Sequence, residues 1–356
     1  MESRPVKVLV APLDWGLGHA TRCIPVIREL IARGVEVMIS ASGGGKILLA
    51  EKFPDCNFID IPGINIRYPE NGSMAFSILF QFPAILKAIR NEHELLQSVV
   101  TTHGITHVIS DNRYGLYSGK TKSVFISHQV HIKSNRLLKF LEPVLFRMNK
   151  SRIEKFDELW IPDNLPPNNL SGDLSDTSGI TVPVRHIGML TRFTSATSAK
   201  EKKYDFIALL SGPEPQRTIL EKKLHAVFFS SPEKCLLVRG TPGLNIIADD
   251  GKVKILATIS DQELQDLLHP GTTLICRPGY STLMDLAVLG HRNALFIPTP
   301  GQTEQEYLAG VLKNKWGYSC LKQAEKFSIA AVVPGKPLPE FKNQDILKKT
   351  IGEFLS

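Results

Sequence analysis

The sequence predicts an α/β protein with two doubly wound parallel-sheet domains that face each other across a cleft. Short runs rich in Val and Ile alternate with helical stretches, which is typical of a parallel sheet covered by helices on both faces. This alternation occurs twice, on either side of a stretch rich in Pro, Ser, Thr and Asn. The chain of 356 residues is also longer than one ordinary hydrophobic core requires.

The first half of the chain supplies the first predicted sheet. Its expected strands are 6–11, 35–40, 57–61, 106–110, 122–127 and 158–162. Its expected helices are 22–33, 45–53, 74–100 and 135–156. We place an N-terminal domain at 1–165 and a linker at 166–203, with one short strand in "VPVRHIG" (182–188).

The second half repeats the pattern. Its expected strands are 204–210, 235–240, 253–258, 272–277 and 293–298, and its expected helices are 216–229, 261–268, 281–289 and 303–315. The tetrapeptide "SDQE" (260–263) matches a helix capping box. We place the second domain at 204–339 and an amphipathic helix at 340–356. Ligands of such sheets bind beyond the carboxyl ends of the strands, which predicts a site between the domains.

Composition narrows the class of protein. Apolar residues make up 43% of the chain, and no apolar run reaches the ~18 residues that a membrane span needs. The five cysteines are scattered, with no spacing typical of zinc ligands, which favours a reducing compartment and a cytoplasmic protein without disulfides. The net charge of +7 favours an anionic partner. No nucleic-acid-binding module is recognisable, so nucleic acid is not expected among the partners.

The first strand leads into "DWGLGHATR" (14–22), a glycine-rich turn before a helix. Gly16 and Gly18 begin a dinucleotide fingerprint, but Thr21 replaces its third glycine, and no acidic residue ends the second strand. "GGGK" (43–46) is not a phosphate loop either, because Ile47 replaces the hydroxyl residue that would hold magnesium. We therefore expect no nicotinamide and no other cofactor.

Proline is best tolerated in the first turn of a helix, so Pro25 predicts that the helix begins near Thr21 or Arg22. His19 then lies at the start of this helix and faces the cleft. An imidazole at that place can take up a proton at neutral pH. The alternative is a histidine that only caps or packs a tight turn.

A second group of polar residues follows the strand at 272–277. Arg277 ends the strand, Gly279 permits a sharp turn, and Ser281 and Thr282 open a helix whose free amides suit a phosphate. Asp285 on the same helix can accept hydrogen bonds from two adjacent ribose hydroxyls. The alternative is an ordinary βαβ unit with helix caps.

Two further loops end at the same edge of the second sheet. Glu304 and Gln305 are suited to neutral hydroxyls. Ser211 and Gly212 stand where a phosphate would be cradled, and Arg217 adds charge, although this stretch also reads as a simple proline-containing turn.

Together these residues resemble the GT-B fold glycosyltransferases of family 28, which include the bacterial enzyme that adds N-acetylglucosamine to lipid I. The family motif "RxGxxTxxE" appears as Arg277, Gly279, Thr282 and Asp285, with Asp in place of Glu. The histidine that ends the family's glycine-rich loop is matched by His19. The resemblance implies that His19 is the general base.

The resemblance also implies donor contacts in the second domain. Ser211 and Gly212 would bind the diphosphate, Ile259 the uracil and Asp285 the ribose. The family's paired glutamines, which touch the donor sugar, align with Glu304 and Gln305, and the glutamate bears on which sugar is used. The implied reaction is an inverting, metal-independent transfer from a UDP-sugar to a hydroxyl of a lipid-linked or cell-envelope glycan.

The resemblance further implies that the N-terminal domain holds the acceptor and that the C-terminal helix packs back on it. The residues expected near the acceptor are Gly16, Gly18, Asp111, Asn112, His128 and Gln129. Asp111 is either a second candidate base or the partner that orients His19. For Asn112 and Gln129 the alternative is loop capping.

Two stretches suggest an anionic membrane surface as a partner. Residues 74–90 are unusually apolar, and 133–156 combine seven Lys or Arg residues with regularly spaced apolar ones. The alternative is that both apolar faces are core. We expect a cytoplasmic protein that lies on the inner face of the membrane. Two other activities stay open on the same fold: a sugar-nucleotide epimerase or hydrolase, and a nucleotide-sugar-binding protein without catalysis.

Overall fold

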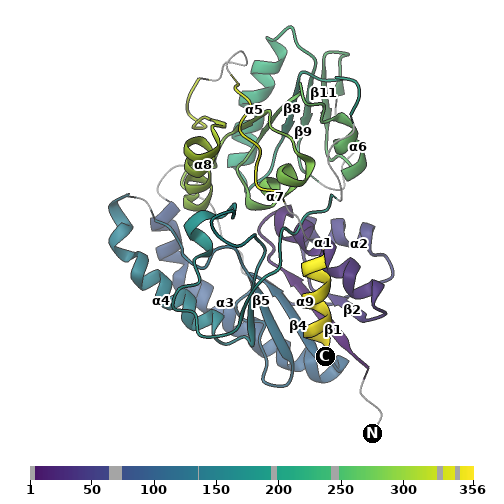
Figure 1. The fold of residues 1–356 in the computed structure, drawn as a ribbon, viewed down its shortest axis with the longest axis vertical. Helices are drawn as coiled ribbons and strands as arrows, with labels where there is room; N and C mark the ends of the chain where they lie inside the picture. Colours follow the sequence, from purple (N-terminus) through teal and green to yellow (C-terminus); the bar gives the residue numbers. More distant parts are fainter. Residues whose placement is uncertain are drawn as a thin grey trace.

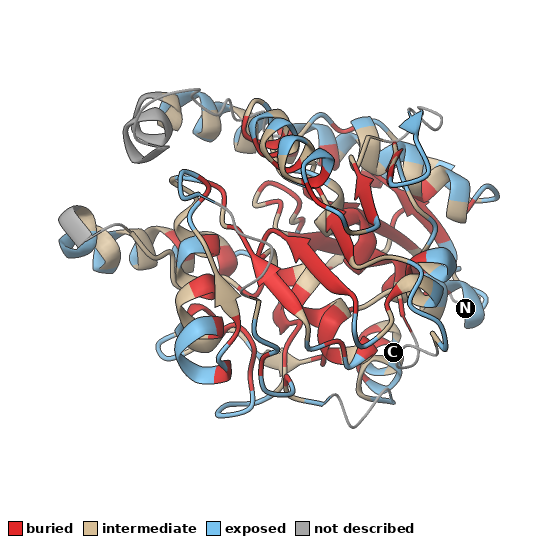
Figure 2. Ribbon diagram, turned by 90° about the horizontal axis from the view of Figure 1, so that it is seen from above, coloured by how far each residue is buried: buried red, intermediate tan, exposed pale blue. Residues whose placement is uncertain are grey.

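The computed structural model describes residues 5–63, 74–134, 136–193, 199–241, 248–326, 332–340 and 345–356. Two seven-stranded sheets, each flanked by helices, form two domains that follow one another along the long axis of the molecule (Figure 1). Buried residues concentrate in the strands and in the helix faces that cover them (Figure 2). The expectation of two parallel-sheet α/β domains is confirmed.

The first sheet has the order β3-β2-β1-β4-β5-β6-β7, and every strand pair is parallel. Its strands are β1 (Lys7–Pro12), β2 (Glu36–Ile39), β3 (Asn57–Phe58), β4 (His107–Asp111), β5 (Lys122–Ile126), β6 (Glu158–Ile161) and β7 (Val184–His186). Its helices are α1 (Leu17–Ala32), α2 (Gly43–Lys52), α3 (Met74–His103) and α4 (Glu142–Ile153), with short 3₁₀ turns η1 (Arg136–Leu141) and η2 (Gly172–Ser175).

The strand β1 shows why its residues form a central strand. Val8 and Val10 point to one face and join the apolar cluster that contains α1, while Leu9 points to the other face and joins Leu96 and Val100 of α3. These three strand residues are completely buried. A strand covered on both faces is therefore an unbroken apolar run, as the sequence shows.

The second sheet has the order β10-β11-β9-β8-β12-β13-β14, parallel except for the β10–β11 pair. Its strands are β8 (Phe206–Leu209), β9 (Cys235–Val238), β10 (Ala248–Asp249), β11 (Val253–Leu256), β12 (Thr273–Cys276), β13 (Ala294–Phe296) and β14 (Ser319–Cys320). Its helices are α5 (Gln216–Phe229), α6 (Asp261–Leu267), α7 (Tyr280–Leu289) and α8 (Thr303–Trp316). The capping box at Ser260 and Glu263 is present.

The segment predicted as a linker, 166–203, is in large part built into the first domain. Its strand β7 pairs with β6 and ends the first sheet. Leu170 and Leu174, from the same segment, are completely buried in the main apolar cluster. The first domain therefore extends at least to His186, beyond the predicted boundary at 165.

The helix α1 begins at Leu17, so the prediction of a start near Thr21 or Arg22 is wrong. Pro25 lies inside the helix, where it removes one backbone hydrogen bond at a typical cost of ~3 kcal/mol. Burial offsets this loss, since Ile24 and Ile27 on either side of the proline are completely buried. The early start also places His19 within the first turn and not before it.

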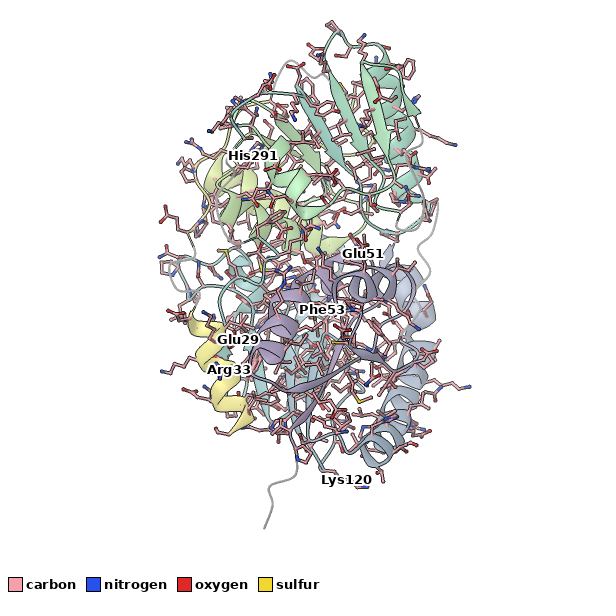
Figure 3. All side chains as sticks on the ribbon, turned by 90° about the vertical axis from the view of Figure 1, so that its right-hand side faces the viewer. Glu29, Arg33, Glu51, Phe53, Lys120 and His291 are labelled. Atoms are coloured by element: carbon pink, nitrogen blue, oxygen red, sulfur yellow. The ribbon has the colours of Figure 1, made fainter. Side chains whose placement is uncertain are left out.

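The last helix, α9 (Asp345–Leu355), packs on the first domain, as the family resemblance implies. The Phe354 ring makes edge-to-face contacts with His107 of β4 and Trp160 of β6, at centroid distances of 4.9 and 5.2 Å. Arg33 pairs with Glu29, one turn before it, and donates to the Lys348 carbonyl of α9 at 2.7 Å (Figure 3). The chain thus returns to its first domain after completing the second.

Candidate active site at the domain interface

The two domains meet where α1 of the first approaches α7 of the second. The Ser281 hydroxyl, in the first turn of α7, donates to the Gly18 carbonyl at 2.8 Å. A Cβ atom at position 18 would lie 3.2 Å from that hydroxyl oxygen, so glycine allows the close approach. Gly16 precedes α1 with a positive φ of 82°, which glycine adopts without strain. The glycine-rich turn therefore serves the contact between the domains.

His19 and Asp111, predicted separately from two strand ends, lie side by side. The Nδ1 atom of His19 is 3.2 Å from the Asp111 carboxylate. The His19 side chain keeps 16% of its surface exposed, whereas Asp111 is completely buried. His19 is thus the one of the two that a substrate can reach.

Arg22 is the central residue of this group, and the sequence prediction missed it as a site residue. Its guanidinium donates a bidentate pair of hydrogen bonds to the two carboxylate oxygens of Asp111, with Nε at 2.7 Å from Oδ2. It also lies 2.8 Å from Nδ1 of His19 and 3.1 Å from Nδ1 of His128. The spacing His19-x-x-Arg22 places both residues on one helix face, and only a helix that starts before His19 reveals this.

The pKa shifts of His19 and Asp111 indicate different roles for the two residues. Burial, reinforced by the Arg22 charge, lowers the pKa of His19, which favours the neutral imidazole. Burial alone would raise the pKa of Asp111, but Arg22 and His19 outweigh it and lower this pKa to about 2. Asp111 is therefore a permanent carboxylate at neutral pH.

His128 and Glu304 join the domains on the other side of Arg22. The Nε2 atom of His128 is 2.8 Å from the Glu304 carboxylate at the start of α8. The His128 ring stacks on the Tyr280 ring, with centroids 3.9 Å apart and an interplanar angle of 4°. The Tyr280 hydroxyl in turn donates to the Pro162 carbonyl at 3.0 Å. The expected donor-sugar residue thus contacts an expected acceptor-domain residue.

The turn after β8 brings Ser211 and Gly212 to the same edge of the second sheet. Gly212 has a φ of 99°, and a Cβ there would lie 3.5 Å from the Thr299 hydroxyl oxygen. Thr299 is completely buried, and its hydroxyl has no hydrogen-bond partner in the structure. Backbone and hydroxyl groups from two adjacent loops therefore come together here.

Two arginines expected to contact the donor are engaged in holding the second domain together. Arg277 is almost completely buried, and its guanidinium donates to the carbonyls of Ile297, Pro298 and Gln216. Burial lowers the pKa of Arg277 to about 10. Arg217 pairs with Glu214 and Glu221, so its charge is already balanced.

Asp285, the expected ribose ligand, faces the segment that connects the domains. Its carboxylate accepts from the Thr191 hydroxyl at 2.7 Å and lies 3.4 Å from the Arg192 Nε atom. Burial raises its pKa, although Arg192 opposes the shift. A ribose hydroxyl would have to share or replace these contacts.

The remaining predicted residues have local partners or lie beside the site. Gln305 turns back and accepts from the Thr299 amide at 2.8 Å. Asn112, at a positive φ of 61°, accepts from the Ser127 hydroxyl, while Gln129 offers its carbonyl to Asn149. The Asn112 contact joins two side chains and the Gln129 contact uses its backbone carbonyl, so the acceptor role and the loop-capping alternative both stay predictions for these residues. Three residues flank helix starts of the second domain: Ile259 before α6, Gly279 as the N-cap of α7, and Thr282 in its first turn.

In the described parts of the chain, no three His, Cys, Asp or Glu side chains come together as metal ligands. The same residues contain no helix with the length and apolar character needed to cross a bilayer.

No family model matches the chain. An uncharacterized glycosyltransferase of Methanosarcina mazei is 23% identical over 345 residues, covering 88% of this chain and 84% of that protein. A second, from Methanosarcina acetivorans, is 23% identical over 339 residues with the same coverage.

Solved structures match over nearly the whole chain. Arabidopsis thaliana UGT89C1, complexed with UDP-L-rhamnose, superposes with a TM-score of 0.56 at 14% identity, covering 99% of this chain and 90% of that one. The spinosyn rhamnosyltransferase SpnG, complexed with thymidine diphosphate, gives 0.55 at 13% identity, covering 98% and 92%. The chain has the GT-B glycosyltransferase fold. The GT-B expectation is confirmed, while membership of family 28 stays a prediction.

Proposed function

We propose that this GT-B protein is an inverting, metal-independent glycosyltransferase. It transfers a hexose or N-acetylhexosamine from a UDP-sugar to a hydroxyl of a lipid-linked or cell-envelope glycan. The supporting observation is the position of His19 beside two contacts that join the domains. Its neighbour Gly18 accepts from Ser281 of α7, and Arg22, which contacts His19, also contacts His128, the partner of Glu304 on α8. A candidate base and candidate donor groups from opposite domains thereby share one interface.

In the proposed reaction, His19 accepts the proton of the acceptor hydroxyl through Nε2. The hydroxyl oxygen bonds to the anomeric carbon from the face opposite the leaving group, and the bond from that carbon to the diphosphate oxygen breaks. The configuration at the carbon is inverted, and UDP leaves with the bonding electron pair. Asp111 stays ionised and orients His19; its burial and pairing with Arg22 argue against its acting as the base itself.

The leaving diphosphate would be met by neutral donors of the second domain. The N-terminus of α7, with Ser281 and Thr282 in its first turn, offers free amides and hydroxyls. The turn at Ser211 and Gly212 adds backbone amides, and the Thr299 hydroxyl is buried without a partner beside it. Such fixed donors can stabilise developing negative charge without a metal ion.

A lipid-linked acceptor is supported by the surface of the first domain. Phe140 is 73% exposed and Val144 49% exposed, on η1 and α4. Exposed Lys139 and Arg147 lie on the same elements. Apolar side chains flanked by basic ones suit an anionic bilayer surface, so we place the protein on the inner face of the membrane. The second stretch predicted to touch a membrane is 74–90, and its side chains at 74–80 lie outside the described residues.

Nucleotide-sugar binding tests the donor half of the proposal. We expect a thermal shift with UDP-sugars, without metal, that GDP-, dTDP- and CMP-sugars do not match. Asp285→Asn is the preferred variant, because it keeps an acceptor for Thr191 while removing the charge, and it should weaken the shift. Asp205→Asn, just before β8 and so at the opposite edge of the second sheet, also keeps an acceptor, here for the Lys234 amide, while removing a carboxylate; it serves as the matched control and should retain the shift.

Turnover separates the three activities that the sequence leaves open. A transferase releases UDP only when an acceptor is present, and His19→Ala abolishes the release. Release of UDP or conversion of the sugar without any acceptor would instead identify a hydrolase or epimerase. Tight binding that never leads to turnover, and that His19→Ala does not alter, would identify a binding protein.

A further inference from the structure

The Nδ1 atom of His19 has two neighbours that require opposite hydrogen-bonding roles of it: one needs an acceptor and the other needs a donor. Arg22 Nη2 lies 2.8 Å away and, as a guanidinium nitrogen, can only donate. Asp111 Oδ2 lies 3.2 Å away and, as a carboxylate, can only accept. A single nitrogen cannot satisfy both in one neutral tautomer. The partner that holds Nδ1 therefore fixes which ring nitrogen carries the proton.

The other contacts of Arg22 form an ordered chain into the second domain. Its Nη1 atom donates to Nδ1 of His128 at 3.1 Å, so the His128 proton belongs on Nε2. That nitrogen then donates to the Glu304 carboxylate at 2.8 Å. Asp111, Arg22, His128 and Glu304 are thus linked by hydrogen bonds that all have a consistent direction.

We propose that Arg22 is a positioning residue that selects the tautomer of His19, and that His128 and Glu304 transmit this selection from the second domain. The inference rests on the proposed role of His19 as the base. While Arg22 donates to Nδ1, the proton sits on Nε2 and that nitrogen cannot accept another. Once Nδ1 donates to Asp111, Nε2 is free to act as a base.

This series of hydrogen bonds gives the second domain a way to control His19 in the first. Glu304 is the residue expected to contact the donor sugar, and here it is held by His128. A sugar that draws Glu304 away releases His128, which loosens the hold on Arg22. Nδ1 of His19 can then turn to Asp111. The base becomes active only when a donor is in place, which protects the nucleotide sugar from wasteful hydrolysis.

The charged and titratable groups facing His19 come from four elements. They are Arg22 on α1, Asp111 at the end of β4, His128 after β5 and Glu304 on α8, while the Cys23 thiol of α1 contacts Asp111. Arg22 is the nearest cation, and it acts with burial to disfavour the imidazolium. Removal of Arg22 should therefore change both the tautomer and the titration of His19.

Ring-nitrogen NMR tests the proposal on the full-length protein without any ligand. Histidine is labelled with ¹⁵N in the ring, His19 is assigned by His19→Gln, and long-range ¹H–¹⁵N spectra report the protonated nitrogen at neutral pH. We expect Nε2–H in the wild type and a protonated Nδ1 in Arg22→Met. Glu304→Ala, at a partly exposed position, should also shift His19 toward Nδ1–H. Glu304→Gln keeps an acceptor for His128 and should leave His19 as in the wild type.

The proposal is overturned if wild-type His19 already carries its proton on Nδ1. It is equally overturned if Glu304→Ala leaves the His19 spectrum unchanged, a result that does not depend on whether Arg22→Met folds. Because the measurement needs no substrate, it stands even if UDP-sugar turnover is never observed. With turnover, Arg22→Met should release UDP from the donor without any acceptor, which the wild type does not do, because its His19 is an active base at all times; the donor KM should change little.

Discussion

At the scale of single residues, the candidate site is built around the ion pair of Arg22 and Asp111. Both side chains are buried, at 2% and 0% exposure, and each has lost its hydration. Such a pair adds little net stability compared with apolar residues, but loss of one partner strands a buried charge. The pair is therefore more important for fixing the geometry of His19 than for folding energy.

Asp111→Asn should lower the free energy of unfolding by about 3–5 kcal/mol, because it leaves the Arg22 charge buried and uncompensated. Urea denaturation followed by circular dichroism measures this change. Glu353→Gln removes a comparable carboxylate from an exposed pair with Arg185 and should change stability by less than about 1 kcal/mol. Equal effects of the two variants would contradict the prediction.

The same carboxylate predicts a pH dependence of stability. The pKa of Asp111 falls from its ordinary 3.8 to about 2 in the folded protein. Between these values the unfolded chain binds a proton that the folded chain does not, so stability rises with pH through this window. The contribution is complete above about pH 4 and is lost as the pH falls toward 2. Asp111→Asn should flatten the slope of unfolding free energy against pH in that range; an unchanged slope would speak against it.

At the scale of secondary-structure elements, the sequence predicted most strands and helices because their patterns are local. The helix predicted at 216–229 has those same ends, and the capping box at 260–263 is present. The start of α1 was mispredicted, because tertiary burial around Pro25 outweighs the local preference. Arg22 was missed as a consequence of that start.

The site was predicted in part for a related reason. His19, Asp111, His128 and Glu304 meet as expected, because the carboxyl ends of parallel strands share an edge. Arg277, in contrast, donates to carbonyls of distant segments. No local sequence pattern shows which backbone oxygens the fold will bring to a side chain.

Ser260→Ala should destabilise the start of α6 by about 1 kcal/mol, because the Ser260 hydroxyl accepts from the Glu263 amide and Glu263 returns a contact to Ser260. Chemical denaturation measures the change. Ser151→Ala, at an exposed position within α4, is the matched control and should cost nothing, since alanine is the better helix former. If Ser151→Ala destabilised the protein as much as Ser260→Ala, the loss of stability would come from removing any serine and not from removing the cap.

At the scale of the whole molecule, a continuous apolar cluster connects the two sheets. It includes Ile24 and Ile27 of α1 together with Leu283 and Met284 of α7. Polar contacts at Gly18 and His128 lie at the same interface. The domains are therefore joined by core packing as well as by the connecting segments.

Phe354→Ala should lower the free energy of unfolding by about 3–5 kcal/mol, because this ring is 1% exposed and contacts Trp160 and His107. Leu355→Ala, at a partly buried neighbouring position, should cost clearly less. Urea denaturation of both variants measures the difference. Similar small losses would mean that α9 is only loosely attached to the first domain.

The return of α9 to the first domain has a topological consequence. Strand β1 opens that domain and α9 closes it, so the second domain is an insertion within the first (Figure 1). A force applied between the two ends of the chain would load the first domain alone and leave the interface of His128 and Glu304 without tension. A circular permutant that joins these ends and opens the chain within the second domain would reverse the nesting, making the first domain the insert.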